Sequence, residues 1–104
     1  MKILVTGASG YLGQHVVPLL FDSGLDVLGI SRSKPNEPIN WLKFDIGEDP
    51  TDLINSHQPD VILHLAWGGL PNYQSLHHFE VEVPKSYKFL ALAVKAGVKK
   101  VIVL

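Results

Sequence analysis

The chain has 104 residues, enough for one domain with a hydrophobic core of its own. Hydrophobic residues make up 46% of it and charged residues 18%, a balance typical of globular rather than disordered proteins. The formal net charge of −1 gives no electrostatic reason to expect a nucleic acid or an anionic membrane as partner. The absence of cysteine excludes disulfides and thiolate metal sites, and no transmembrane run or signal-peptide pattern occurs, so a cytoplasmic protein is predicted.

The chain opens on a short apolar strand that leads into a glycine-rich turn. The strand is predicted over Lys2–Thr6, and glycines recur at positions 7, 10 and 13 as a helical pattern begins. Gly7 would allow the tight turn, Gly10 would let the backbone approach a phosphate, and Gly13 would let the helix pack closely on the sheet. A glycine triplet between a strand and a helix predicts a site where a pyrophosphate binds at the helix N-terminus.

The next elements continue the alternation of helix and buried strand. In chain order they are a helix, two strands joined by a polar loop with two prolines, and a short helix: Leu12–Ser23, Asp26–Ser31, Trp41–Asp45 and the helix that begins at Asp49-Pro50. Gly24 stands where a helix C-terminus commonly closes. Asp49 is the predicted N-cap of the short helix and Pro50 its first residue, because proline needs no amide partner there.

The second half of the chain contains a strand, a helical segment and a final strand. The strands are predicted over Asp60–Ala66 and Lys100–Leu104, with the helical segment between them. Pro84 interrupts this segment because its nitrogen cannot donate an intrahelical hydrogen bond. We therefore expect one helix around Tyr73–Glu80 and a fresh start near Val83 or Pro84, with a single kinked helix as the alternative.

Strands rich in Val, Ile and Leu that alternate with helices predict an α/β fold, in which helices cover both faces of a parallel sheet. The expected architecture is a Rossmann-type doubly wound parallel sheet with strand order 3-2-1-4-5. The helix that contains Tyr87–Ala96 is apolar around much of its circumference, so we expect a partner subunit or another part of the chain to cover it. The last strand would form an open apolar edge, which predicts a homodimer or aggregation.

Four motifs follow one another in a fixed order. They are Thr6-Gly-Ala-Ser-Gly-Tyr-Leu-Gly13, Phe44-Asp45-Ile46, Asp60-Val-Ile-Leu-His-Leu-Ala66 and Ala96-Gly-Val-Lys-Lys-Val-Ile-Val103. Together they resemble the extended short-chain dehydrogenase/reductases, a family that includes the NAD-dependent epimerase/dehydratases and nucleotide-sugar reductases. The resemblance covers residues 1–104 and implies an NAD(P)-binding Rossmann domain.

The resemblance also implies which residues would bind the cofactor. The glycine-rich turn would contribute Gly7, Ser9, Gly10, Tyr11, Leu12 and Gly13. Asp45 would accept a hydrogen bond from the adenine amino group, with Ile46 as its apolar companion. Leu65 and Ala66 would pass the nicotinamide ribose.

The end of the second predicted strand indicates which cofactor is preferred. Family members that prefer NAD usually carry an acidic residue there, whereas this chain has Ser31, followed by Arg32 and, close behind, Lys34. A carboxylate would repel a 2′-phosphate, while a hydroxyl and a guanidinium would accept it. NADP(H) is therefore predicted over NAD(H). The alternative is that Arg32 and Lys34 only solvate a loop.

The resemblance implies a nucleotide-sugar oxidoreductase or epimerase as the parent enzyme, with a nucleotide sugar as substrate. His64-Leu-Ala-Trp-Gly-Gly69 resembles reductases of 4-keto-6-deoxy nucleotide sugars in particular. The alternatives are an NAD-dependent epimerase/dehydratase and a non-catalytic nucleotide-binding module. The family's catalytic Ser or Thr and its Tyr-x-x-x-Lys follow the fifth strand. No catalytic residue is therefore expected among these 104 residues, and the chain alone would be inactive.

Other polar residues give weaker signals. Adjacent His77 and His78 would point about 100° apart on a helix, so no metal is expected. His64 is expected as a satisfied core or cofactor-adjacent residue, and Trp67 as either lining the substrate mouth or packing a loop. The family often shows Asn-Val-x-Gly-Thr-x-Asn where this chain has Glu82, Lys85, Ser86 and Lys88, which argues against an active-site role for that helix.

Overall fold

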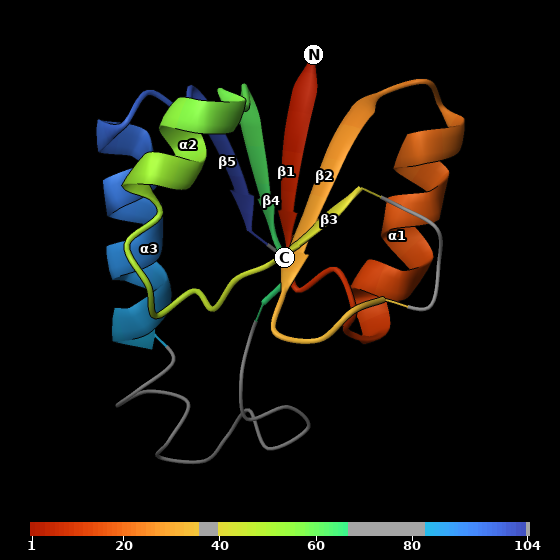
Figure 1. Cartoon of the computed structure of the whole chain (residues 1–104), viewed down its shortest axis with the longest axis horizontal. Coiled ribbons are helices and arrows are strands. Elements are labelled where there is room, and N and C mark those ends of the chain that lie inside the picture. The colour runs from red at the N-terminus through yellow and green to blue at the C-terminus, as the bar shows by residue number, and fades with distance from the viewer. Residues whose placement is uncertain (36–39, 67–82, 104) are drawn as a thin grey trace.

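The protein is described by a computed structural model over residues 1–35, 40–66 and 83–103 (Figure 1). Within these residues, five strands pair in parallel to form one sheet, and all their arrows point to the same end. The strands are β1 (Lys2–Thr6), β2 (Asp26–Ser31), β3 (Trp41–Lys43), β4 (Val61–His64) and β5 (Lys100–Val103). Their order, β3-β2-β1-β4-β5, confirms the predicted topology.

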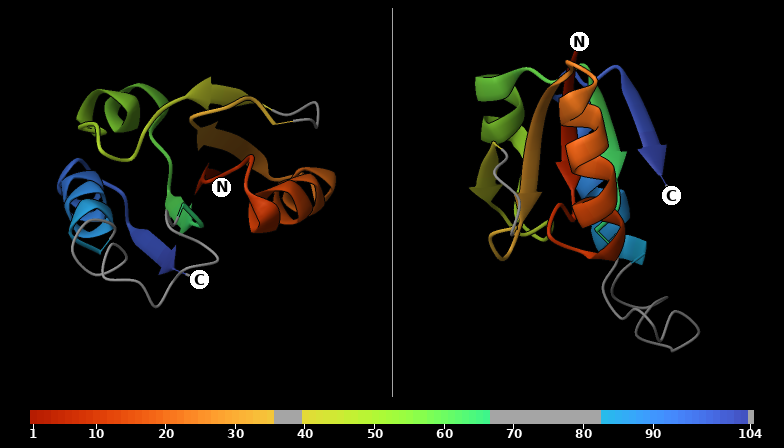
Figure 2. Two further views of the ribbon diagram at one scale, coloured as in Figure 1. Left: turned by 90° about the horizontal axis from the view of Figure 1, so that it is seen from below. Right: turned by 90° about the vertical axis from the view of Figure 1, so that its right-hand side faces the viewer.

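Helices cover both faces of this sheet, as Figures 1 and 2 show from three sides. Helix α1 (Tyr11–Asp22) lies on one face, and α2 (Thr51–His57) and α3 (Val83–Lys95) lie on the other. Among the described residues, none of these helices is long and apolar enough to cross a membrane.

Side chains of β1 alternate between two separate hydrophobic cores. Val5 belongs to the core beneath α1, where it is clustered with Val17. Leu4, its neighbour, belongs to the opposite core together with Phe89 of α3. Successive side chains of a strand point to opposite faces, so a run that is buried on both sides must be apolar throughout. The unbroken apolar run of this strand is therefore explained by the two helical layers.

Two strands end earlier than the sequence indicates, because side chains take over their hydrogen bonds. Strand β4 ends at His64 rather than Ala66, since the amides of Leu65 and Ala66 both donate to Thr6 Oγ1. Strand β3 ends at Lys43 rather than at Asp45. Beyond it the Asp45 amide donates to Glu48 Oε1 at 3.2 Å, and Asp45 Oδ1 accepts the Gly47 amide. Such local side-chain bonds compete with a strand ladder.

The predicted helix ends are close to the observed ones. The short helix begins at Thr51, with Pro50 as its N-cap, one residue later than predicted. Asp49 Oδ1 nevertheless accepts the Thr51 amide at 2.9 Å, the bond expected of a capping carboxylate. Gly24 follows α1 with φ of +81°. Helix α3 begins at Val83, as expected, while the predicted 73–80 helix, the kinked alternative and Trp67 lie outside the described residues.

Strand β5 forms one edge of the described sheet, and its apolar side chains are partly open. Ile102 is 40% exposed and Val103 is 48% exposed. Tyr87 and Val94 of α3 are also exposed, so the helix predicted to need a second cover has none among the described residues. The exposed apolar edge and the uncovered helix, on which the predicted homodimer was based, are therefore both present. Dimerisation itself stays a prediction.

Candidate functional site

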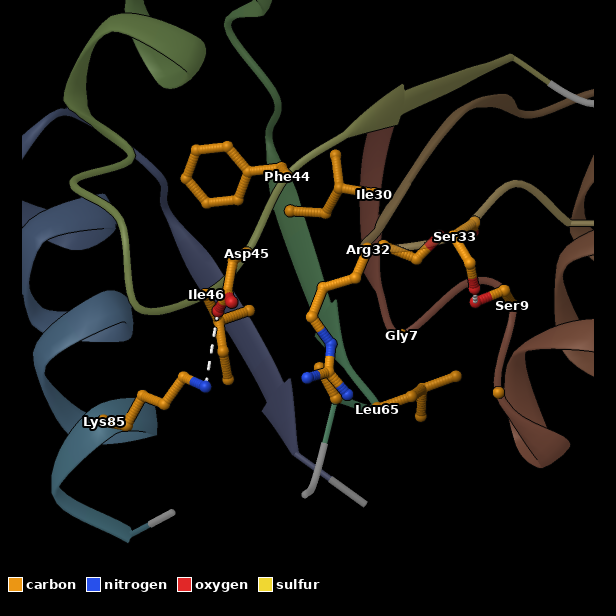
Figure 3. Close-up of a pocket in the computed structure, with 13 residues that line it drawn as sticks. Gly7, Ser9, Ile30, Arg32, Ser33, Phe44, Asp45, Ile46, Leu65 and Lys85 are labelled. Carbon is orange, nitrogen blue, oxygen red and sulfur yellow. Dashed lines mark hydrogen bonds and ion pairs between the residues drawn. The ribbon is translucent and has the colours of Figure 1, made fainter. Parts of the chain in front are cut away.

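A pocket of about 200 Å³ lies at the carboxyl ends of the strands (Figure 3). It opens beside β1, the strand at which the order of the sheet reverses. Strands β2 and β3 lie on one side of β1, whereas β4 and β5, which come later in the chain, lie on the other. In open α/β sheets, ligands bind in the crevice at this reversal. Nine of the predicted cofactor-binding residues line it: Gly7, Ser9, Gly10, Ser31, Arg32, Asp45, Ile46, Leu65 and Ala66. The other four lining residues were not predicted to bind the cofactor: Ile30, Ser33, Phe44 and Lys85.

The glycine-rich turn packs closely against two stretches of backbone, the residues that follow β4 and the first turn of α1. Gly7 has φ of +68°, and a Cβ there would lie 2.9 Å from backbone atoms of Ala66. A Cβ on Gly13 would lie 2.2 Å from the carbonyl oxygen of Gly7. Gly13 thus permits close packing of the helix against the turn, and not against the sheet as predicted. A residue with a side chain at position 13 would push the helix away from the turn.

The N-terminus of α1 presents amide groups without a side-chain cap. Gly10 is the N-cap residue, it has extended backbone, and no side chain caps the helix or places a carboxylate in its first turn. An uncapped N-terminus of this kind attracts anions through its free amides and the helix dipole. Tyr11 and Leu12 are exposed and do not line the pocket, so their predicted contacts would have to use their backbone amides.

A buried hydrogen-bond chain joins β1, β4 and α3 behind the pocket. Thr6 Oγ1 accepts the amides of Leu65 and Ala66, so its own hydrogen is left for His64 Nδ1, which lies 2.8 Å away. We therefore assign the imidazole proton to Nε2, which donates to Ser86 Oγ at 3.0 Å. His64 is fully buried and packs on the Phe89 ring. It is a satisfied core residue, in agreement with one of the two roles expected of it.

We expect the burial of His64 to make the stability of the fold depend on pH. Burial lowers the pKa of His64 from 6.5 to about 4 in the folded chain. The unfolded chain therefore binds the proton first. The free energy of unfolding is expected to fall by about 3 kcal/mol as the pH drops from about 6.5 to about 4, and to be fully present above that window. Urea unfolding between about pH 7.5 and about pH 4.5 tests this. The His57→Asn variant should show the same dependence of the unfolding free energy on pH as the unmodified chain. An unfolding free energy that does not change with pH would contradict the role given to His64.

On the β2 side of the pocket, the Ser31 hydroxyl is already hydrogen-bonded within the protein, whereas the Arg32 side chain extends into the pocket. The Ser31 hydroxyl donates to the Ser33 carbonyl at 2.6 Å and accepts the Trp41 indole N–H at 2.7 Å. A phosphate oxygen that accepted a hydrogen bond from the Ser31 hydroxyl would have to displace the Ser33 carbonyl. The contact of Ser31 with a 2′-phosphate stays a prediction. The Arg32 side chain lines the pocket and points into it (Figure 3).

Asp45 and Lys85 face each other on the side of the pocket opposite Ser9 and Ser33 (Figure 3). Lys85 Nζ lies 3.3 Å from Asp45 Oδ1, which also accepts the Gly47 amide at 2.9 Å. The Gly47 amide, then the Lys85 ammonium and the Arg32 guanidinium, hold the pKa of the Asp45 carboxyl below its usual range, although partial burial acts the other way. The carboxylate is therefore charged at neutral pH.

Lys85 lines the pocket, although the departure from the family pattern argued against an active-site role for its helix. Helix α3 leads into the parallel strand β5, so it must begin at the edge of the sheet where the other strands end (Figure 1). Its first turn therefore lies beside the pocket, and Lys85 belongs to that turn. The start of this helix could therefore be placed near the pocket from the chain topology, although the contact of Lys85 with Asp45 could not. Among the residues that the structure describes, no cluster of three or more His, Asp or Glu side chains could hold a metal ion.

Comparisons with known proteins show which family the chain belongs to. The sequence model of the NAD dependent epimerase/dehydratase family matches residues 3–104. The chain is 30% identical over 110 residues to a dTDP-6-deoxy-L-talose 4-dehydrogenase (NAD(+)) of Aggregatibacter actinomycetemcomitans, covering 97% of this chain and 40% of the relative.

Two solved structures share its fold. The UDP-glucose 4-epimerase of Thermus thermophilus in complex with NAD superposes with a TM-score of 0.82 at 23% identity, over 97% of this chain and 36% of that one. The UDP-glucose 4-epimerase of Stenotrophomonas maltophila, with bound NAD and formylated UDP-arabinopyranose, gives 0.81 at 25% identity, over 99% and 36%. The chain thus spans well under half the length of these relatives. The family match over nearly all its residues places this chain in the NAD-dependent epimerase/dehydratase family.

Proposed function

We propose that the chain is the dinucleotide-binding part of an NAD(P)-dependent enzyme that oxidises, reduces or epimerises a nucleotide sugar. The observation that carries this proposal is the pocket at the strand-order reversal, bordered by a glycine-rich turn and an uncapped helix N-terminus. The residues fit the cofactor because Gly7 and Gly10 present bare backbone to the pocket, and because the amides at the start of α1 are available to bind a pyrophosphate.

Each side of the pocket supports one part of the dinucleotide. The amides at the start of α1 would hold the pyrophosphate, and Asp45 would accept a hydrogen bond from the adenine amino group. Ile46 supplies apolar surface beside Asp45, while Leu65 and Ala66 lie at the end of β4, where the nicotinamide ribose would pass. The bound nicotinamide would exchange a hydride with a sugar carbon. The chain's own contribution is to bind and orient the cofactor.

Reduction of a 4-keto-6-deoxy nucleotide sugar is the reaction we favour. The relative whose name describes a 4-dehydrogenase of a 6-deoxy nucleotide sugar supports it. The second candidate is an NAD-dependent epimerase, favoured by the fold shared with UDP-glucose 4-epimerases. Assaying the full-length gene product with 4-keto-6-deoxy nucleotide sugars and with UDP-glucose would separate them. Turnover of neither, together with intact dinucleotide binding, would favour a non-catalytic module.

We further propose that the pocket prefers NADP(H), because Arg32 can bind a 2′-phosphate and no carboxylate stands at the end of β2 to repel it. The NAD named for the relatives favours the opposite preference. Calorimetry is expected to show NADPH binding about tenfold more tightly than NADH, and Arg32→Ala should remove most of this difference.

Lys34 provides the matched control for this experiment. It lies two residues from Arg32, it is exposed, and it does not line the pocket. Lys34→Ala should therefore leave the ratio of the two affinities nearly unchanged. Equal affinities of the unmodified chain for NADPH and NADH would refute the role of Arg32. A homodimer and a cytoplasmic location complete the proposal, supported respectively by the exposed apolar residues of β5 and α3 and by the absence of cysteine.

A further inference from the structure

The carboxylate of Asp45 is held by one oxygen. The Gly47 amide and the Lys85 ammonium both contact Oδ1, at 2.9 Å and 3.3 Å. No described residue makes a hydrogen bond or ion pair with Oδ2. Since Asp45 lines the pocket, Oδ2 is the oxygen left to accept a hydrogen bond from a ligand. A carboxylate with one oxygen fixed by two donors keeps a defined orientation, which a freely rotating one does not.

The Lys85 side chain reaches Asp45 across a glycine. A Cβ on Gly47 would lie 3.3 Å from Lys85 Cε and 3.4 Å from Asp45 Oδ1. The lysine stem therefore passes over bare backbone on its way to the carboxylate. Both partners remain partly open to solvent, with side chains 26% and 39% exposed, so the ion pair orients the carboxylate more than it stabilises the fold.

The first turn of α3 is anchored to the sheet immediately beside this lysine. Ser86 is almost completely buried, and its hydroxyl accepts the hydrogen bond from His64 Nε2. His64 is bound in turn to Thr6 at the end of β1. The backbone that carries Lys85 is thus tied through three side chains to the strand that leads into the glycine-rich turn.

We propose that Lys85 is a positioning residue for the adenine end of the cofactor, whose ammonium holds Asp45 Oδ1 so that Oδ2 meets the exocyclic amino group of the base. The inference rests on the proposed function, because it requires the dinucleotide to occupy this pocket. It assigns a role to a residue that stands where the family often has glycine. Lys85 acts through Asp45 and does not itself need to touch the ligand.

A double-mutant cycle on the chain tests this assignment with NADH and NADPH as probes, by calorimetry. Asp45→Asn should weaken binding about tenfold, because an amide cannot replace a charged acceptor. Lys85→Met should weaken it about threefold, while Lys85→Arg should restore most of the loss by keeping a cation beside Oδ1. In the Asp45→Asn background, Lys85→Met should have no further effect, because the lysine acts only through the carboxylate.

Lys88→Met, one turn further along α3 on an exposed residue, is the matched control and should bind like the unmodified chain. Additive losses in the cycle would mean that Lys85 contacts the ligand directly, and unchanged binding by Lys85→Met would mean that it does nothing. Either result overturns the positioning role and leaves the proposed function standing. Failure of the unmodified chain to bind either dinucleotide would instead overturn the proposed function, and the role of Lys85 with it.

Discussion

Replacing Gly13 by alanine is expected to lower the free energy of unfolding by about 3 kcal/mol or more, enough to unfold a marginally stable domain. The new Cβ would lie 2.2 Å from the Gly7 carbonyl oxygen and 2.7 Å from that of Ala8. These are backbone atoms, which cannot rotate away as a side chain would. Helix α1 would have to shift from the turn, and Val17 would lose its packing in the core on that face. Urea denaturation followed by far-ultraviolet circular dichroism measures the loss.

The matched control is Gly10→Ala in the same turn. Gly10 has φ of −76°, which alanine adopts without strain, and a Cβ there would meet only the Gly7 carbonyl oxygen at 3.3 Å. Its stability should change by about 1 kcal/mol or less, while dinucleotide binding should weaken because the methyl group enters the pocket. Equal destabilisation by both substitutions would show that close packing is not the reason for glycine at position 13.

Replacing Thr6 by valine is expected to destabilise the fold by about 3 kcal/mol or more, although the two side chains have nearly the same shape. The Thr6 hydroxyl accepts two backbone amides and donates to His64 Nδ1. Valine would leave all three groups buried without this partner, at about 1–3 kcal/mol for each group. Equilibrium urea unfolding at pH 7.5, above the window in which His64 titrates, would measure the effect separately from protonation.

Thr6→Ser is the control, because serine keeps the hydroxyl and removes only one methyl group. It should lose about 1 kcal/mol, the usual cost of a small cavity, and keep the pH dependence of unfolding. A Thr6→Val chain as stable as Thr6→Ser would mean that water or other groups satisfy the amides. The comparison therefore isolates the hydrogen-bond chain from simple packing.

The strands and their parallel direction were predictable from local pattern, and their order was predictable from the doubly wound fold that this pattern and the glycine-rich turn indicate. Strands buried on both faces must be continuously apolar, and alternation with helices makes the sheet parallel. The positions of the strand ends were less predictable. At β4 the end depends on Thr6, a residue 59 positions from Leu65, whose hydroxyl takes the amides that would otherwise extend the strand.

The candidate site shows the same division. Gly7, Gly10 and Asp45 could be placed in the pocket from motifs, because each motif is a short segment whose backbone geometry follows from its own residues. Lys85 could not be assigned from its own segment, and the departure from the family pattern there pointed away from the site. Its contact with Asp45 joins residues 40 positions apart.

From its residues alone, the chain could be assigned to a doubly wound fold with a glycine-rich turn between the first strand and the first helix, because periodicity and glycine spacing act over a few residues at a time. The tertiary structure alone decided that the Ser31 hydroxyl is engaged by Ser33 and Trp41, that His64 is buried as the Nε2–H tautomer, and that Lys85 contacts Asp45. Apart from the local bond from Ser31 to the Ser33 carbonyl, these contacts join side chains from different segments, and they are settled only when those segments pack together.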